Sequence, residues 1–348
     1  MATTVRVGVL NDMGDLGAAS NDIADWLERE VETLRARGRI AQSVEFCHAY
    51  GLGLPTGTAE AIEHAYQELV DQDVALIVGP GIDDNALVIA PLAERLRVPT
   101  IHWTGAERAR GKYMFQLQAS SHEEEGLLIA RHLSRLGARR LGVAYDISPT
   151  GTRYLRALEN EAAALGLDLC ACEGISPVSH DADEIGAALL ASEPDAVVYL
   201  GIGVAAPALA RSLAGRGWQG PRMMNTAGLR GYRDDFAKEC DGWRYVGTHS
   251  DGNRTLQALC KQLDVPASGR AAAAKGHDLG RLVAEGIARA RDVSREGLRL
   301  GLEQVKWLPA AQGEEGTLLS FGVHDHAGLH GRYLVVRQWH DGQSVEVS

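Results

Sequence analysis

The sequence lacks the motifs on which several enzyme classes depend. The turn after the first predicted strand has no GxGxxG pattern for a dinucleotide, and the chain contains no GxxxxGK[ST] loop and no GxSxG elbow. No nucleophile stands in a recognisable set with a general base. We therefore expect a protein that is not an enzyme, with no catalytic residue, no cofactor and no bound metal.

Long apolar runs are missing as well, including at the N-terminus. No stretch approaches the ~18 consecutive apolar residues that a membrane-spanning helix needs. The first four residues, MATT, lead directly into an apolar run at 5–10, without a basic segment, an apolar signal core or a cleavage site. As the sequence stands we expect a cytoplasmic protein; if a leader was removed from it, the location is periplasmic.

Cysteine is scarce, and basic residues are outnumbered by acidic ones. The five cysteines include no CxxC pair, and Cys170 and Cys172 are too close in the chain for an ordinary disulfide, so we expect buried free thiols. The 46 acidic and 35 basic side chains give a formal net charge of -11. This surplus argues against binding to nucleic acid and to anionic lipid.

What the sequence does contain is a long alternation of short apolar runs and amphipathic segments. A first set of predicted strands lies at 5–10, 43–48, 74–78 and 99–102, with helices between them. A second set follows at 140–145, 167–172, 196–200 and 222–225. Continuous apolar runs are typical of parallel sheets covered on both faces. The pattern predicts two doubly wound α/β domains in tandem, joined near residues 119–121.

The last hundred residues break this alternation. Helices are predicted at 271–290 and 294–306, and β segments at 316–321 and 332–339. A terminal hairpin is expected to turn at Asp341-Gly342.

These runs, in this order and spacing, resemble the Leu/Ile/Val-binding protein family of ABC-transporter receptors. The segments that carry the resemblance are VRVGVL at 5–10, DVALIVGP at 73–80, VPTI at 98–101, LGVAYD at 141–146 and EPDAVVYLG at 193–201. The resemblance covers nearly the whole chain and implies the type I periplasmic-binding fold, with two doubly wound parallel-sheet α/β lobes joined by three crossovers. The expected lobes are residues 1–120 with 251–328, and residues 121–250 with 329–348.

The resemblance also implies a small-molecule ligand that is held between the lobes, at the carboxyl ends of the strands, and enclosed by hinge closure. The loops at those ends supply the candidate ligand-binding residues, which are Asp12, Met13, Ile82, Asp83, His102, Trp103, Thr104, Gly105, Ala106, Thr150, Ile202, Ala227 and Arg230. Backbone N–H groups at the helix starts in these loops can bind a carboxylate.

Four of these positions depart from the pattern of the amino-acid-binding relatives. Ala106 stands where those relatives have a threonine, Thr150 where they have a tyrosine, and Ile202 where they have an aromatic residue. Ala227 stands at or near the acidic residue that binds the ligand's ammonium group. A buried ammonium without an anionic partner is costly, so an ordinary α-amino acid is not the expected ligand.

We expect a small organic acid instead, either aromatic or amino-acid-like. Trp103 would stack on its apolar part, and Arg230 or helix N-termini would bind its carboxylate. The remaining polar side chains of the pocket would then be Asp83, His102, Thr104 and Thr150.

Four of these side chains also fit ordinary structural roles. Asp83 fits the capping of the helix that follows it, and His102 fits a buried structural histidine. Trp103 fits the filling of a gap at the lobe edge. Arg230 fits equally well as a solvated residue or as the ion-pair partner of an aspartate at 234–235.

Two histidine-containing segments suggest chemistry that their context opposes. The run SHDADE at 179–184 precedes a predicted helix and fits a solvated capping turn. The run VHDH at 323–326 lies on a turn before the last strand, without a third metal ligand at a suitable spacing.

Two functions follow from the resemblance. The first is a receptor that closes its two lobes on a small organic solute and hands it to the membrane subunits of an ABC transporter. The alternative is a cytoplasmic ligand sensor of the same fold that regulates a partner protein. The sequence leaves the ligand's identity and the oligomeric state open.

Overall fold

The chain folds into two compact units, and it passes from one to the other three times. The computed structural model describes residues 4–12, 23–232 and 234–347. Unit 1 comprises Met1–Ala119 and His249–Tyr333, and unit 2 comprises Ser120–Thr248 and Leu334–Ser348. The three crossovers of the predicted fold therefore fall after residues 119, 248 and 333.

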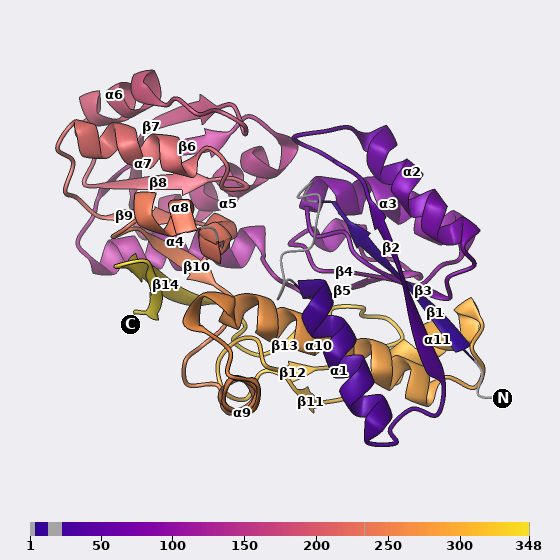
Figure 1. Ribbon diagram of the computed structural model, residues 1–348. Coiled ribbons are helices and arrows are strands. Elements are labelled where there is room, and N and C mark those ends of the chain that lie inside the picture. The colour runs from indigo at the N-terminus through magenta and orange to yellow at the C-terminus, as the bar shows by residue number, and fades with distance from the viewer. Residues whose placement is uncertain (1–3, 13–22, 233, 348) are drawn as a thin grey trace. The chain divides into compact units, whose positions relative to one another are not determined.

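Unit 1 is built on a parallel five-stranded sheet with the strand order β2-β1-β3-β4-β5. The strands are β1 (Thr4–Asn11), β2 (Ser43–Tyr50), β3 (Leu76–Val78), β4 (Thr100–His102) and β5 (Met114–Gln116). Helices α2 (Ala59–Asp71) and α3 (Asp83–Leu96) cover one face (Figure 1). The other face is covered by α1 (Ile23–Ala36), α10 (Arg270–Arg289) and α11 (Arg295–Glu303).

A smaller antiparallel sheet completes unit 1. It contains β11 (Leu308–Pro309), β12 (Leu318–Leu319) and β13 (Leu329–His330), and α9 (Arg254–Leu263) precedes α10 in the chain. Because β13 pairs with β12 through Leu319 and Leu329, the chain stays in unit 1 until Tyr333.

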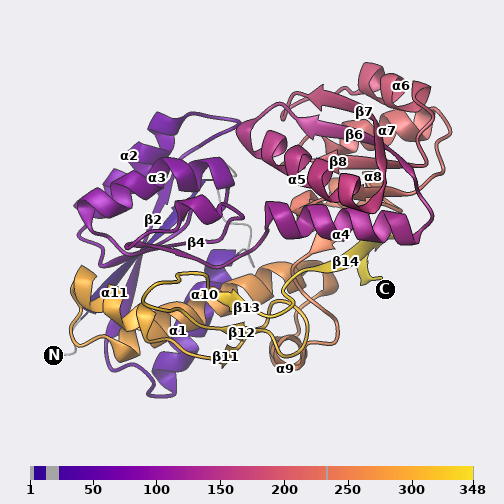
Figure 2. The ribbon, with the colours of Figure 1, turned by 180° about the vertical axis from the view of Figure 1, so that it is seen from behind.

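Unit 2 contains a seven-stranded sheet with the order β15-β14-β10-β9-β8-β6-β7. Its strands are β6 (Arg140–Asp146), β7 (Asp168–Ile175), β8 (Ala196–Leu200), β9 (Arg222–Met224), β10 (Arg244–Gly247), β14 (Val335–His340) and β15 (Gln343–Glu346). Helices α4 (His122–Arg135) and α5 (Pro149–Leu165) cover one face (Figure 2). The opposite face carries α6 (Asp183–Ala191), α7 (Ala206–Gly215) and α8 (Asp234–Glu239).

Local sequence signals account for several element ends. Ser121 and Ser148 cap α4 and α5 by accepting hydrogen bonds from backbone N–H groups three residues later, and Pro149 occupies the first turn of α5. The β14–β15 hairpin turns at Asp341 and Gly342, which both have positive φ, as predicted for an Asp-Gly turn. The short strands β5 and β10 were not predicted.

The five cysteines are free thiols, but the expectation that all are buried is wrong. Cys47 and Cys240 are buried, whereas Cys172 is exposed. Cys172 lies on β7, which is an edge strand of its sheet, so one side of the strand has no neighbour to cover it.

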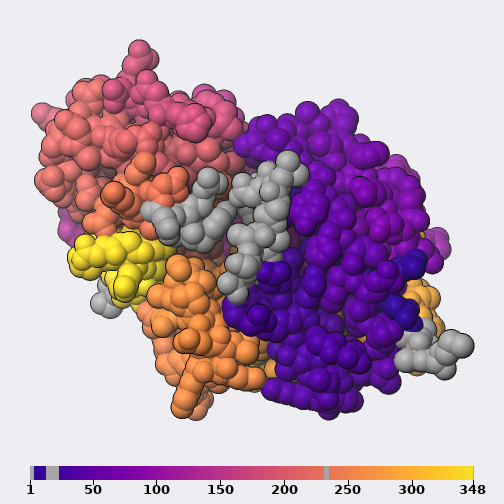
Figure 3. All heavy atoms as spheres, viewed as in Figure 1, coloured from indigo at the N-terminus to yellow at the C-terminus, as the bar shows by residue number. Residues whose placement is uncertain are grey.

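Helices α1 and α10 pack against each other in unit 1, and the indigo and orange parts of that unit border each other in Figure 3. Glycines in α10 allow this close approach. A Cβ at Gly280 would lie 2.7 Å from the carbonyl oxygen of Leu27 and 2.7 Å from the Cβ of Glu30. The backbone of α10 therefore contacts α1 directly at this point.

The substitution Gly280→Ala should lower the free energy of unfolding. Alanine favours the helix by up to ~1 kcal/mol, but overpacking against the backbone of α1 costs roughly 1–3 kcal/mol, so destabilisation is expected. Chemical denaturation measures the change. The matched control is Gly215→Ala in α7, where an added Cβ meets nothing within 4 Å and no loss of stability is expected. Equal effects of the two substitutions would contradict this interpretation of α1–α10 packing.

Candidate functional site

The carboxyl edge of the unit 1 sheet is organised by a buried aspartate that follows β1. Asp12 is 1% exposed, and its carboxylate accepts hydrogen bonds from the N–H groups of Gly81 and Ile82 and from the amide of Asn85, each at 2.9 Å. These bonds fix the turn between β3 and α3. Burial raises the pKa of Asp12, which the three donors partly oppose. The neighbouring candidate Met13 lies outside the described residues.

A second buried aspartate fixes the loop after β4. Asp83, in the first turn of α3, accepts a 2.7 Å hydrogen bond from the N–H of Gly105. It does not act as the N-cap of α3, because that position is Ile82, which has no capping side chain. The Thr104 hydroxyl accepts a hydrogen bond from the N–H of Ala106 at 3.0 Å. Asp83, from α3, and Thr104, from the loop itself, therefore both stabilise the loop after β4.

His102 and Trp103 are both buried at this edge and have different neighbours. His102 is completely buried, its Nδ1 lies 3.0 Å from the Thr104 hydroxyl, and burial lowers its pKa to about 3, which keeps the imidazole neutral. Trp103 packs its indole against the backbone of Gly81, where a Cβ would lie 2.5 Å from the indole Nε1. Gly81 and Ile82 beside it are half-buried.

At the carboxyl edge of the unit 2 sheet, as in unit 1, a buried aspartate accepts hydrogen bonds that fix a loop. Asp146 ends β6, is completely buried, and accepts hydrogen bonds from the Tyr199 hydroxyl at 2.6 Å and from the N–H of Ile202 at 2.8 Å. The Tyr199 hydroxyl in turn accepts a hydrogen bond from the N–H of Gly203 at 3.2 Å. Burial raises the pKa of Asp146 to about 6, against the opposing effect of these donors.

The loop after β9 is held from two sides. Asn225 forms a reciprocal pair of hydrogen bonds with the backbone N–H and carbonyl of Gly201. The next residue, Thr226, donates its N–H to the carboxylate of Glu125 at 2.7 Å. Ala227 follows and is buried. Thr150, also buried, lies in the first turn of α5, where its hydroxyl accepts a hydrogen bond from Arg153 at 3.1 Å.

Arg230 differs from the other candidates in the surroundings of its guanidinium group. Its Cδ lies against the backbone at Gly203, where a Cβ would come within 2.8 Å and where φ is +93°. Among the side chains that the structure describes, which do not include those of residues 231–234, none forms a hydrogen bond or ion pair with the guanidinium, although its charge lowers the pKa of Asp146. Arg230 lines a cavity of about 380 Å³ within unit 2, together with Gly203, Pro207 and Phe236. Asp235 and Glu239 also line this cavity, and Glu239 pairs with Arg211.

The structure assigns ordinary roles to the two histidine-containing segments. Within the 179–184 run, the Asp181 carboxylate accepts a hydrogen bond from the N–H of Asp183 at the start of α6, as expected for a capping turn. His326 stacks on Phe115 with ring centroids 3.9 Å apart, and its Nδ1 lies 2.6 Å from the carbonyl oxygen of Gly111.

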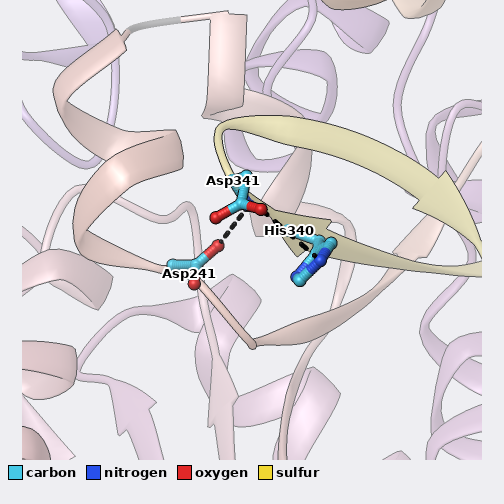
Figure 4. A group of neighbouring side chains, drawn as sticks. All are labelled: Asp241, His340 and Asp341. Carbon is cyan, nitrogen blue, oxygen red and sulfur yellow. Dashed lines mark hydrogen bonds and ion pairs between the residues drawn. The ribbon is translucent and has the colours of Figure 1, made fainter.

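One group of potential metal ligands lies elsewhere among the described residues. Asp241, His340 and Asp341 bring their ligand atoms within 4.8 Å of one another at the β14–β15 turn (Figure 4). All three are exposed, and the Asp241 carboxylate accepts the N–H of Asp341 at 2.8 Å, which is a structural role in the turn. This group gives no reason to assign a metal.

The residues that sequence reasoning missed are those that hold the loops rather than line them. Tyr199 was noticed only within a predicted strand, and Asp146 and Asn225 only where a predicted strand meets its loop. Glu125 carried no signal, because three successive glutamates at 123–125 resemble a solvated helix start. Their roles depend on which side chains face the loops, which appears only in the folded chain.

Comparison with known proteins agrees with this architecture. Residues 56–342 match the family model described as periplasmic binding protein. The structure is similar to a periplasmic binding protein type 1 from Bordetella pertussis Tohama I, with a TM-score of 0.83, 16% identity, and coverage of 99% of this chain and 100% of that one. No curated protein matches the sequence.

The names of two further solved structures state a ligand or a role. A leucine binding protein, LivK, from Thermotoga maritima matches with a TM-score of 0.80 and 15% identity over 99% of this chain and 98% of that one. An ABC transporter substrate-binding protein from Desulfitobacterium hafniense, in complex with Leu, matches with a TM-score of 0.76 and 15% identity over 99% and 100%. At these identities the likeness shows the fold.

No helix among the described residues is both long enough and apolar enough to cross a bilayer.

The family match covers more than four fifths of the chain, and the strand orders of both units agree with the predicted fold. The chain belongs to the periplasmic binding protein family and has the type I fold of its Leu/Ile/Val-binding members.

Proposed function

We propose that the protein is a non-enzymatic receptor that closes its two units on a small organic acid. In this proposal unit 1 contributes Ile82, Trp103, Gly105 and Ala106, and unit 2 contributes Thr150, Ile202, Ala227 and Arg230. The candidates Asp12, Asp83, His102 and Thr104 act indirectly, because their polar atoms hold neighbouring loop groups. The amides that they fix are then available in a set orientation.

The observation that carries the proposal is that the Arg230 guanidinium has no bonding partner among the side chains that the structure describes. A half-buried guanidinium without a hydrogen bond or ion pair to the described residues is a favourable partner for a carboxylate, which it can bind through two parallel N–H···O bonds. A cation at this edge would repel a ligand ammonium. The apolar side chain of Ala227 offers no compensating charge in the same loop. An organic acid without an amino group is therefore favoured over an α-amino acid.

Trp103 supports an aromatic or otherwise flat apolar part in the ligand. Its indole lies against Gly81, which has no side chain to cover the ring edge. An aromatic side chain held on a rigid loop can contribute roughly 0.5–1.5 kcal/mol by stacking, beyond the effect of area buried.

We further propose that the receptor serves an ABC transporter and contacts its membrane subunits. The similarity to the Desulfitobacterium hafniense protein, which is named an ABC transporter substrate-binding protein, supports this part of the proposal. A ligand sensor that regulates a partner protein would use the same binding residues, and the two roles differ in the partner that is captured.

Small aromatic acids should raise the melting temperature of the protein. A panel of benzoate, phenylacetate, L-phenylalanine and L-leucine can be tested by thermal shift. A ligand present at a hundredfold excess over Kd stabilises the folded state by about 2.7 kcal/mol. We expect stabilisation by benzoate or phenylacetate. Strong stabilisation by L-leucine, without an effect of the two acids, would contradict the roles proposed for Arg230 and Ala227.

The substitution Arg230→Ala should weaken binding of the stabilising acid by at least tenfold, because a charge-assisted bidentate contact is lost. Arg230→Lys should recover only part of the affinity, since an ammonium cannot form the two parallel bonds. Isothermal titration calorimetry measures both. The control is Arg156→Ala on the exposed face of α5, which should leave affinity unchanged. An Arg230→Ala variant with parental affinity would remove Arg230 from the site.

A further inference from the structure

A buried glutamate in unit 2 stands apart from the two beside it in the chain. Glu123 and Glu124 in the first turn of α4 are exposed, whereas Glu125 is completely buried. The next residue, Gly126, packs directly on α5, where a Cβ would lie 3.0 Å from the backbone carbon of Ala157. The close α4–α5 contact therefore removes the Glu125 carboxylate from solvent.

Donors from three different segments converge on this carboxylate. Oε2 accepts the N–H of Thr226 at 2.7 Å. Oε1 accepts the N–H of Ser121 at 2.9 Å, the hydroxyl of Tyr154 at 3.0 Å and the hydroxyl of Thr226 at 3.3 Å. All four partners can donate, and the two backbone N–H groups can only donate, which matches an ionised carboxylate; a protonated carboxyl would have to turn its proton toward one of the two hydroxyls.

The segments that bind Glu125 include the start of unit 2 and the segment that contains proposed ligand residues. Ser121 is the second residue of unit 2 after the first crossover, and Tyr154 comes from α5. Thr226 begins the 3₁₀ segment Thr226–Tyr232, which contains the proposed ligand residues Ala227 and Arg230. One carboxylate thus fixes the start of the ligand loop to the start of unit 2.

Two opposing effects act on the protonation of Glu125. Burial raises its pKa to about 7, while the N–H groups of Thr226 and Ser121, the nearby His122 and the Tyr154 hydroxyl all act to lower it. The ring centroids of His122 and Tyr154 are 4.4 Å apart, so His122, whose positive charge would favour the Glu125 carboxylate, is the other titratable group to consider at this cluster. The carboxylate is therefore placed where a modest change in pH alters its charge.

Ionisation and the Thr226 hydrogen bond are thermodynamically linked. Since the bond from Thr226 favours the charged carboxylate, the charged carboxylate must favour that bond to the same extent. A protonated Glu125 would hold the loop less firmly, because a neutral acceptor forms a weaker hydrogen bond than a carboxylate.

We infer that Glu125 is a positioning residue for the ligand loop of unit 2, and that the protein binds its ligand more tightly when this carboxylate is ionised than when it is protonated. The inference rests on the proposed function for the part that concerns ligand. The part that concerns the loop can be tested without ligand.

The first test is amide hydrogen exchange of Thr226 in the ligand-free protein between pH 6 and pH 8, corrected for the intrinsic pH dependence of exchange. Protection of the Thr226 N–H should rise about tenfold over this range in the parent protein. It should be low and flat in Glu125→Gln. The control Glu123→Gln, on the exposed side of the same turn, should behave as the parent does.

Global stability distinguishes positioning from a merely structural role. A carboxyl with a raised folded-state pKa contributes stability that is present below its unfolded-state pKa and is lost as pH rises through about 7. The melting temperature of the parent relative to Glu125→Gln should thus fall from pH 6 to pH 8, while protection of Thr226 rises. Protection that falls together with stability would overturn the inference. A pH step that persists in Glu125→Gln would assign the effect to His122 and would overturn it too.

The second test measures binding of benzoate, which stays ionised throughout this pH range. Affinity should be about tenfold higher at pH 8 than at pH 6 in the parent and in Glu123→Gln, and independent of pH in Glu125→Gln. Equal pH dependence in Glu125→Gln would overturn the positioning role. If the exchange results are as expected but benzoate binds none of the proteins, the benzoate part of the proposed function fails and the loop assignment stands. Should Glu125→Gln not fold, the exchange profile of the parent still decides the loop assignment, because a flat profile would refute it.

Discussion

Buried carboxylates that bind backbone N–H groups are the interaction on which the candidate site depends. Asp12 holds the turn between β3 and α3, Asp83 holds the loop after β4, and Asp146 holds the loop after β8. Glu125 does the same for the loop after β9. A parallel sheet ends in loops whose N–H groups lack strand partners, so a buried acceptor both satisfies those groups and fixes the loop.

The residues that fix these loops are therefore different from the residues proposed to contact a ligand. The carboxylates bind groups of their own unit, and in the proposed site the loops that they fix contribute small or apolar residues such as Gly105, Ala106, Ile202 and Ala227. In the proposed site, the charge offered to a ligand comes from Arg230 and from loop amides. A site with a cation and amides, but without a free carboxylate in the loop of Ala227, is suited to an anion.

The sequence was sufficient for the fold because long runs carry strong periodic signals. The apolar runs at 5–10 and 196–200 are strands β1 and β8, and the Asp341-Gly342 turn closes the predicted hairpin. The loops that contain Trp103 and Arg230 could also be located, because they follow such strands. Which side chains hold those loops could not be predicted. Glu125 and Glu123 are identical residues two positions apart, and only the packing of α4 on α5 makes one buried and the other exposed.

The central claim is that the site binds an anion rather than a zwitterion or a neutral solute. The most direct measurement is a calorimetric comparison of benzoate with benzamide, which has almost the same shape but no charge. Benzoate is expected to bind at least tenfold more tightly, because only the carboxylate can form charge-assisted bonds with Arg230. Equal binding of the two compounds, or tight binding of L-leucine alone, would contradict the claim.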